Sequence, residues 1–153
     1  MLKNIDPLLT PELLKLLAEM GHEDAIVLAD ANFTAMRYRI STVSQQVIHL
    51  PALGIARVAQ AVLSVLPLGL PDEQPVAFMH ASGQSPAYVT PAQQAVIAMV
   101  QADPAHAGVV ACPMERFAFY EQARIAYVIV QTGEMSPFGN FILKKGVIAH
   151  RLA

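Results

Sequence analysis

Short apolar segments alternate with helix-like segments along most of the chain, and this alternation limits the possible folds more than any other feature of the sequence. Two of the helix-like segments begin with the same dipeptide, Thr10-Pro11 and Thr90-Pro91, in which threonine suits the N-cap and proline the first helical position. Strands that alternate with helices predict an α/β domain with a largely parallel or mixed sheet. The expected helices cover 11–20, 55–66, 91–101 and 113–124, and the expected strands cover 25–29, 46–50, 75–79, 108–111, 125–132 and 140–144.

The chain carries few charges for its size. Of its 153 residues, 54% are apolar and only 14% are charged. The length suits one domain that spans residues 1–153. A domain of this size with so few charges either exposes large apolar patches or buries them against neighbouring subunits. We expect the second arrangement, a homo-oligomer.

Charge and hydropathy argue against several kinds of partner. The formal net charge is −2 and no basic stripe is present, so we expect no nucleic-acid partner. The longest strongly apolar run, 58–70, is interrupted by Pro67 and Gly69 and is shorter than the ~20 residues that span a membrane. Cys112 is the only cysteine, which excludes an internal disulfide. Residues 1–6 include an acid where a signal peptide needs an apolar stretch. These features predict a soluble, cytoplasmic protein without a membrane partner.

Two polar residues flank the first expected strand. His22 follows the stop of the first helix, and histidine titrates near neutrality, so it can pass a proton in either direction. It is also a residue that the helix dipole favours near a helix C-terminus. Asp30 ends the strand, where α/β folds bind their ligands. A capping or turn-forming aspartate explains the same position. A functional and a structural interpretation therefore stay open for both His22 and Asp30.

Further polar candidates occur later in the chain. Arg116 and Tyr120 are four residues apart and share one face of an expected helix, which offers a fork of donors beside a hydroxyl to a polyhydroxylated ligand. Such a pair is also common on solvated helix faces. Gly139-Asn140 offers an amide donor and acceptor, although it is ordinary turn material as well. The long irregular segment 33–45 directly follows Asp30 and is placed to form a lid or wall over a site.

The remaining histidines give no sign of a metal site. They have no partners at metal-ligand spacing, so we expect structural or surface roles for His49, His80, His106 and His150. The chain also lacks a phosphate loop and a nucleophile elbow. The sequence therefore predicts neither a metal nor a cofactor.

Three blocks of the sequence, taken together, carry a family resemblance. The first runs through Met1-Leu2-Lys3, Pro7-Leu8-Leu9 and 11–22 to Asp30-Ala31; the second is Arg116-Phe117-Ala118-Phe119-Tyr120-Glu121; the third contains Thr132-Gly133-Glu134, Gly139-Asn140 and 143–147. In these blocks the chain resembles the L-fucose mutarotase family, the sister of the D-ribose pyranases. The second block resembles the arginine-bearing helix of the fucose branch. The resemblance covers roughly 1–35 and 112–147 and is thinner between them.

The resemblance implies a fold, an activity and a site. The fold is a three-layer α/β/α domain that associates into ring-like oligomers, commonly decamers. The activity is that of an isomerase, which interconverts the α and β anomers of L-fucose or a related aldose by general acid/base ring opening. His22 and Tyr120 are the implied catalytic residues, His22 as acid/base and Tyr120 close to the reacting centre. The sugar is held by Asp30, Arg116, Phe138, Gly139 and Asn140.

The chain departs from the family pattern at three places. Phe138 stands where the family typically has tyrosine, Asn32 stands where a histidine is common, and the segment 36–44 is longer than usual. A typical hydrogen bond contributes about 0.5–1.5 kcal/mol net, so loss of the tyrosine hydroxyl allows sugar binding while shifting sugar preference. Two alternatives stay open: a pyranase that converts pyranose and furanose forms of a pentose, and a monosaccharide-binding module without catalysis.

Overall fold

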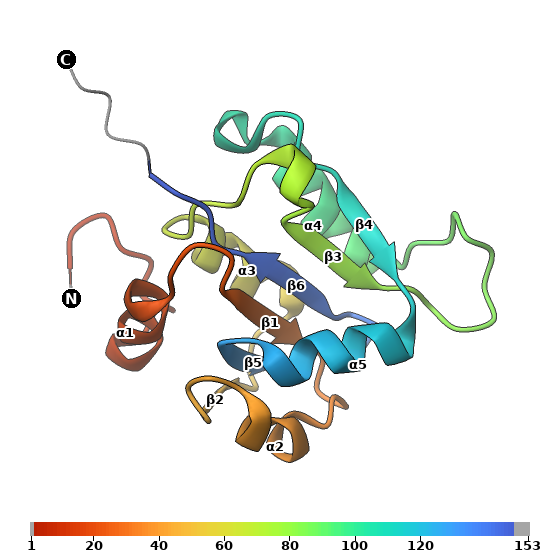
Figure 1. Cartoon of the computed structure of the whole chain (residues 1–153), viewed down its shortest axis with the longest axis horizontal. Coiled ribbons are helices and arrows are strands. Elements are labelled where there is room, and N and C mark those ends of the chain that lie inside the picture. Colours follow the sequence, from red (N-terminus) through yellow and green to blue (C-terminus); the bar gives the residue numbers. More distant parts are fainter. Residues whose placement is uncertain (1, 149–153) are drawn as a thin grey trace.

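The computed structural model describes residues 2–148, which form one mixed six-stranded sheet with helices on both faces (Figure 1). The sheet has the order β2-β5-β1-β6-β3-β4. Its strands are β1 Ala25–Ala29, β2 Val47–Leu50, β3 Val76–Met79, β4 Ala111–Met114, β5 Val128–Thr132 and β6 Phe141–Lys144. The helices are α1 Pro11–Glu19, α2 Ala35–Tyr38, α3 Ile55–Leu63, α4 Pro91–Ala102 and α5 Arg116–Ile125.

The strand directions bring the carboxyl ends of several strands to one edge of the sheet. β1 runs parallel to β5, β5 parallel to β2, and β3 parallel to β4, whereas β6 lies antiparallel between β1 and β3. The carboxyl ends of β1, β3 and β4 therefore lie beside the start of β6. Ligands of open α/β sheets bind beyond the carboxyl ends of the strands, so this edge is where a site is expected.

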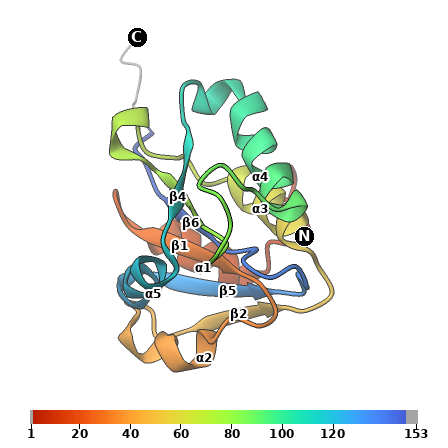
Figure 2. The same cartoon turned by 90° about the vertical axis from the view of Figure 1, so that its right-hand side faces the viewer.

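Two apolar cores lie on opposite faces of the sheet, which confirms the expected three-layer α/β/α architecture. Figure 2 shows α3 and α4 on one side of the sheet and α5 with α2 on the other. The alternation within β1 explains the division, because successive strand side chains point to opposite faces. Ile26 and Leu28 pack into the core beneath α1, α3 and α4, whereas Val27 and Ala29 pack into the core beneath α5.

Several predicted boundaries are wrong by three residues: the helix expected at 55–66 ends at Leu63, and the strand expected from Ile125 begins at Val128. The expected strand 108–111 is β4 at Ala111–Met114, and the helix expected from Pro113 begins at Arg116. Proline at the start of a helix and proline in an edge strand are both tolerated, and β4 is an edge strand, so Pro113 alone did not decide between them. The carboxylate of Glu115 is the N-cap, because it accepts the backbone N–H groups of Phe117 and Ala118 at 2.8 and 3.1 Å.

The segment expected to be irregular, 33–45, contains the short helix α2 and a 3-10 turn at Arg39–Ser41. Its aromatic side chains pack against α5: the ring centroids of Phe33 and Tyr38 lie 5.8 and 5.6 Å from that of Tyr120. The segment is therefore held against the helix that carries Arg116 and Tyr120. Among the described residues, no helix combines the length and the apolar character needed to cross a bilayer.

Candidate functional site

A small polar cavity lies at the sheet edge where the carboxyl ends of β1, β3 and β4 meet the start of β6. Its volume is about 150 Å³, and it is lined by Asp30, Asn32, Phe33, Met79, Arg116, Tyr120, Pro137, Phe138 and Asn140. Five of the residues predicted from the sequence thus line one cavity although they are distant in the chain. The sixth, Gly139, is buried in the loop that joins Phe138 to Asn140.

Asp30 is the buried acid of this cavity, with only 4% of its surface exposed. Its Oδ1 accepts the backbone N–H of Asn32 at 2.9 Å, and its Oδ2 accepts the side-chain amide of Asn140 at 2.8 Å. Burial raises the pKa of Asp30 above its ordinary value, and the bonds from Asn140, Asn32 and Phe33 oppose that shift without cancelling it. Each carboxylate oxygen keeps acceptor capacity for a ligand hydroxyl.

The loop that carries Phe138 is fixed by a side chain from α4. Gln93 is fully buried, and its amide nitrogen donates to the carbonyl oxygens of Met79 and Phe138, both at 2.7 Å. Its amide oxygen accepts the backbone N–H of Thr90 at 3.0 Å. Phe138 adopts a left-handed backbone with φ 65°, which is uncommon for a bulky residue. Gln93 therefore ties the end of β3 to a strained loop residue, and both ends of this link line the cavity.

Gly139 is closely packed in the same loop. A Cβ at this position would lie 3.0 Å from the side chain of Glu134, 3.1 Å from the carbonyl oxygen of Ser136 and 3.8 Å from the Cβ of Asp30. A larger residue would require the Glu134 side chain or the Ser136 backbone to shift by a few tenths of an ångström. The predicted role of Gly139 at the site is thus matched by a steric reason for glycine, although glycine itself offers no side chain to a ligand.

Arg116 supplies the positive charge of the cavity from the first turn of α5. Its guanidinium stacks over the ring of Phe117 at 4.8 Å, and its Nε is buried without a hydrogen-bond partner among the described residues. A buried donor without a partner costs free energy unless a ligand or water accepts from it. Tyr120, one helical turn further on, lines the same cavity, so the two residues predicted to share a helix face do so.

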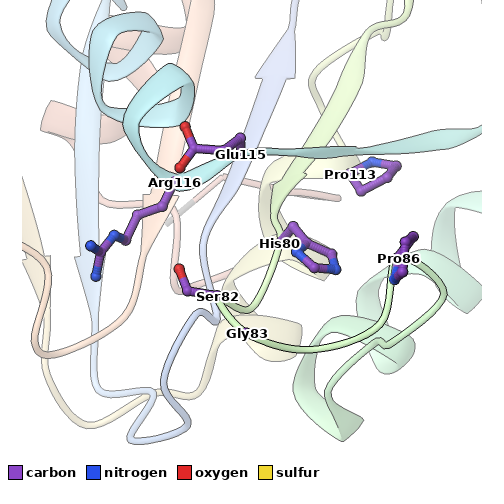
Figure 3. A pocket seen from close by; sticks show the side chains of 7 residues that line it. All are labelled: His80, Ser82, Gly83, Pro86, Pro113, Glu115 and Arg116. Carbon is purple, nitrogen blue, oxygen red and sulfur yellow. The ribbon is translucent and has the colours of Figure 1, made fainter.

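A larger cavity of about 490 Å³ lies on the other side of Arg116, lined by His80, Ser82, Gly83, Pro86, Pro113, Glu115 and Arg116 (Figure 3). The polar groups here are largely engaged within the protein. Nε2 of His80 lies 2.9 Å from the carbonyl oxygen of Ser85, and Glu115 caps α5. In Figure 3 the Arg116 side chain extends away from His80 and Pro86. The smaller cavity, where Asp30, Arg116 and Tyr120 converge, is therefore the better candidate site.

His22 lies at the opposite end of β1 from Asp30, because it precedes the strand that Asp30 follows. The five residues of the strand alone separate the two by roughly 16 Å. His22 is half-exposed, and its Nε2 lies 3.2 Å from Oε1 of Glu73. A single chain therefore does not bring the predicted acid/base together with the residues predicted to hold the sugar.

His22, Glu23 and Glu73 also form the one cluster among residues 2–148 in which three potential metal ligands converge, with their ligand atoms within 4.8 Å of one another. Histidine and carboxylate ligands would suit a divalent cation. Two of the three residues are exposed, and no second feature of the cluster points to an ion. The prediction that the protein needs no metal stays a prediction.

Sequence reasoning missed several residues that shape the cavity. Met79 is the last residue of β3 and Asp30 is the first residue after β1, so the rule that ligands bind beyond the carboxyl ends of strands points to the region of Met79 as well. The Thr90-x-x-Gln93 spacing is that of a capping box, but nothing in the sequence shows that Gln93 also reaches Met79 and Phe138.

His106, expected to be structural or at the surface, is buried beside Asp103, with 3.2 Å between Nδ1 and Oδ2. His150 lies outside the described residues.

The fold and the cavity define a three-layer α/β protein with a small polar ligand site at the carboxyl ends of its strands. The chain belongs to the RbsD / FucU transport protein family, whose model matches residues 3–148, so the resemblance found in the sequence is confirmed. It is 41% identical over 147 residues to an L-fucose mutarotase of Glaesserella parasuis serovar 5 (strain SH0165), with 96% of both chains covered.

Solved structures agree with this assignment. The crystal structure of protein Atu2016, described as a putative sugar binding protein, superposes with a TM-score of 0.91 at 40% identity and covers 97% of each chain. A fucose mutarotase from Streptococcus pneumoniae in complex with L-fucose superposes with a TM-score of 0.80 at 33% identity, covering 97% of this chain and all of that one. The agreement over 97% of this chain supports the described fold.

Proposed function

We propose that the protein is a sugar mutarotase, an isomerase that interconverts the α and β anomers of L-fucose or a related aldose. The observation that carries the proposal is the convergence of Asp30, Arg116, Tyr120 and Asn140 on one cavity of about 150 Å³. The similarity to an L-fucose mutarotase over 96% of the chain supports the same reaction.

The cavity residues bind and orient the sugar. Asp30 accepts hydrogen bonds from sugar hydroxyls, the Arg116 guanidinium donates to a sugar oxygen, and the Phe138-Gly139-Asn140 loop closes one wall. Asn140 acts partly through Asp30, because its amide already bonds that carboxylate. These groups hold the sugar still while its ring opens, which is the orientation effect that reduces the entropic cost of the reaction.

Anomer exchange then proceeds by ring opening, rotation and ring closure, with proton transfers at the C1 hydroxyl and the ring oxygen. A base removes the proton of the C1 hydroxyl, the bond between C1 and the ring oxygen breaks as the C1 carbonyl forms, and an acid protonates the ring oxygen. After rotation about the C1–C2 bond, the reverse steps close the ring on the other face. General acid–base catalysis of this kind gives ~10²–10⁴-fold. We assign His22 as the acid/base, with Tyr120 close to the reacting centre.

Because His22 is remote from the cavity of its own chain, its assignment requires a neighbouring copy. Exposed apolar side chains occur at both ends of the sheet: Met36, Phe117 and Met135 near the cavity, and Leu2, Leu70 and Val147 towards the His22 end. Contacts that join unlike surfaces head to tail generate a ring when the rotation from one copy to the next closes. We therefore propose a cytoplasmic homo-oligomer, a ring-like decamer as the family resemblance implies, in which one copy presents His22 to the cavity of the next.

Saturation-transfer NMR on equilibrated L-fucose tests the activity. The protein at micromolar concentration is expected to speed exchange between the two anomeric protons; no acceleration with L-fucose, galactose, ribose or other aldoses would refute the proposal.

The His22→Ala variant is expected to bind sugar with unchanged affinity but to lose the exchange. Unchanged exchange in this variant would exclude His22, whereas sugar binding without exchange in the unmodified protein would favour a binding module. Pyranose–furanose exchange of a pentose alone would indicate a pyranase.

Co-expression of two inactive variants tests the shared site. If His22 acts on the cavity of a neighbour, oligomers mixed from equal amounts of His22→Ala and Asp30→Asn contain some cavities in which both residues are intact, about a quarter of the total for random mixing. These oligomers are expected to regain activity in proportion. If both residues act from the same chain, every cavity lacks one of them and no activity returns.

A further inference from the structure

Glu73 is held more firmly than an ordinary surface carboxylate. It ends the 3-10 turn Pro71–Glu73, where its Oε2 accepts the backbone N–H of Leu70 at 2.7 Å. Its backbone carbonyl oxygen accepts the Lys144 ammonium at 3.4 Å. The side chain is 24% exposed, against 46% for His22. One carboxylate oxygen is therefore hydrogen-bonded within the turn, and this bond fixes the direction in which the other oxygen points.

The second carboxylate oxygen faces an imidazole nitrogen. Oε1 of Glu73 lies 3.2 Å from Nε2 of His22, which comes from the connection between α1 and β1. An ionised carboxylate has only acceptors, so a bond between the two requires the hydrogen to be on Nε2. In the neutral imidazole, Nδ1 is then the nitrogen without a proton. Glu23 completes the cluster, but no hydrogen bond joins its carboxylate to the His22 ring among the described residues.

We propose that Glu73 is a positioning residue that fixes the tautomer of His22 and makes Nδ1 the nitrogen that exchanges protons with the sugar. This inference rests on the proposed function, in which His22 is the acid/base. In the forward step Nδ1 takes the proton of the C1 hydroxyl, and the resulting imidazolium is stabilised by the Glu73 carboxylate. When Nδ1 returns the proton to the ring oxygen, the imidazole is again neutral with its hydrogen on Nε2, ready for the next turnover.

The tautomer is measurable without any sugar. In protein labelled with ¹⁵N in its histidine rings, the ring-nitrogen shifts of His22, assigned by comparison with His22→Ala, are expected to show hydrogen on Nε2 at a pH where the imidazole is neutral. Glu73→Gln is expected to reverse this. Its single amide oxygen would keep the bond from Leu70, so the amide nitrogen would donate to Nε2 and move the ring hydrogen to Nδ1. Hydrogen on Nδ1 in the unmodified protein would overturn the proposal even if the variant failed to fold.

Kinetics test whether the tautomer matters for catalysis. Glu73→Gln is expected to lower kcat for anomer exchange roughly 10–100-fold, which lies within the ~10²–10⁴-fold that acid–base catalysis supplies, and to leave KM nearly unchanged. Asp72→Asn is the matched control, because it removes one charge from an exposed neighbour in the same turn and is expected to change neither the tautomer nor kcat. A switched tautomer with full kcat would overturn the catalytic part of the inference.

The two proposals fail in distinguishable ways. If no sugar shows catalysed exchange, the proposed function is wrong, whereas the tautomer measurement still reports whether Glu73 holds His22. If exchange is catalysed but Glu73→Gln changes neither the tautomer nor kcat, the function stands and the role of Glu73 is refuted.

Discussion

Asn140 and Asp30 bond to each other in both directions. The Asn140 amide nitrogen donates to Oδ2 of Asp30 at 2.8 Å, and the Asn140 amide oxygen accepts the backbone N–H of Asp30 at the same distance. The pair joins the end of β1 to the start of β6, two strands that are neighbours in the sheet but lie far apart in the chain. The acid of the cavity is thus positioned by a side chain 110 residues away.

Asn140→Ala is expected to destabilise the fold and weaken sugar binding together. It removes both bonds and leaves a buried carboxylate and a buried N–H without this partner, and an unsatisfied buried group costs about 1–3 kcal/mol. Urea unfolding should show a loss of this size, with sugar affinity falling in the same variant. Asn32→Ala is the control for stability, because this exposed side chain makes no bond to Asp30. Equal stability of Asn140→Ala and the unmodified protein would contradict the prediction.

Gln93→Met is expected to loosen the Phe138 loop from β3. Methionine fills similar space but cannot donate to the carbonyl oxygens of Met79 and Phe138, so stability should fall by about 1–3 kcal/mol or more. Sugar affinity should fall as well, because Phe138 lines the cavity. Denaturant unfolding and calorimetric titration measure the two effects. Gln94→Met, a change at the adjacent exposed position, should produce neither.

Local patterns predicted the layered α/β fold and offered Asp30, Arg116, Tyr120 and Asn140 as candidates, and the family resemblance then assigned them to one site. Asp30 was found because the carboxyl end of an apolar strand is a general ligand position, and Arg116 with Tyr120 because their spacing is helical. Long-range pairing left no such signal. Nothing near Asn140 reveals that β6 runs antiparallel beside β1, and that pairing is what brings its amide to Asp30.

The same limitation applies to His22. Its position before β1 is evident in the sequence, and the strand necessarily separates it from Asp30. A sequence resemblance assigns a role to each residue but does not show which subunit of an oligomer supplies it. Glu73 lay beyond sequence reasoning as well, because its contact with His22 joins segments 51 residues apart.

Glu134 is expected to give the fold a pH-dependent stabilisation. Burial alone would raise the pKa of Glu134, but backbone donors, chiefly Ser136 and Ile55, outweigh burial and hold the pKa below its ordinary value of 4.5. The contribution is therefore fully present above that ordinary value and is lost as pH falls through the lowered one. Unfolding free energies of the unmodified protein and Glu134→Gln should differ at pH 7 and converge in acid. A difference that grew in acid would contradict the assignment.

Phe138→Tyr is expected to change which sugars bind well, with little effect on the fold. Phe138 lines the cavity and is only partly buried, so an added hydroxyl can reach a sugar oxygen without being trapped in the core. One new hydrogen bond contributes about 0.5–1.5 kcal/mol, which corresponds to an affinity gain of roughly 2–13-fold for any sugar that offers a partner there. Calorimetric titration with L-fucose, galactose and ribose measures the pattern. The left-handed φ of 65° at this position is already carried by phenylalanine, so tyrosine adds no backbone strain. An equal change for all three sugars would mean that the ring, rather than the hydroxyl, meets the ligand at residue 138.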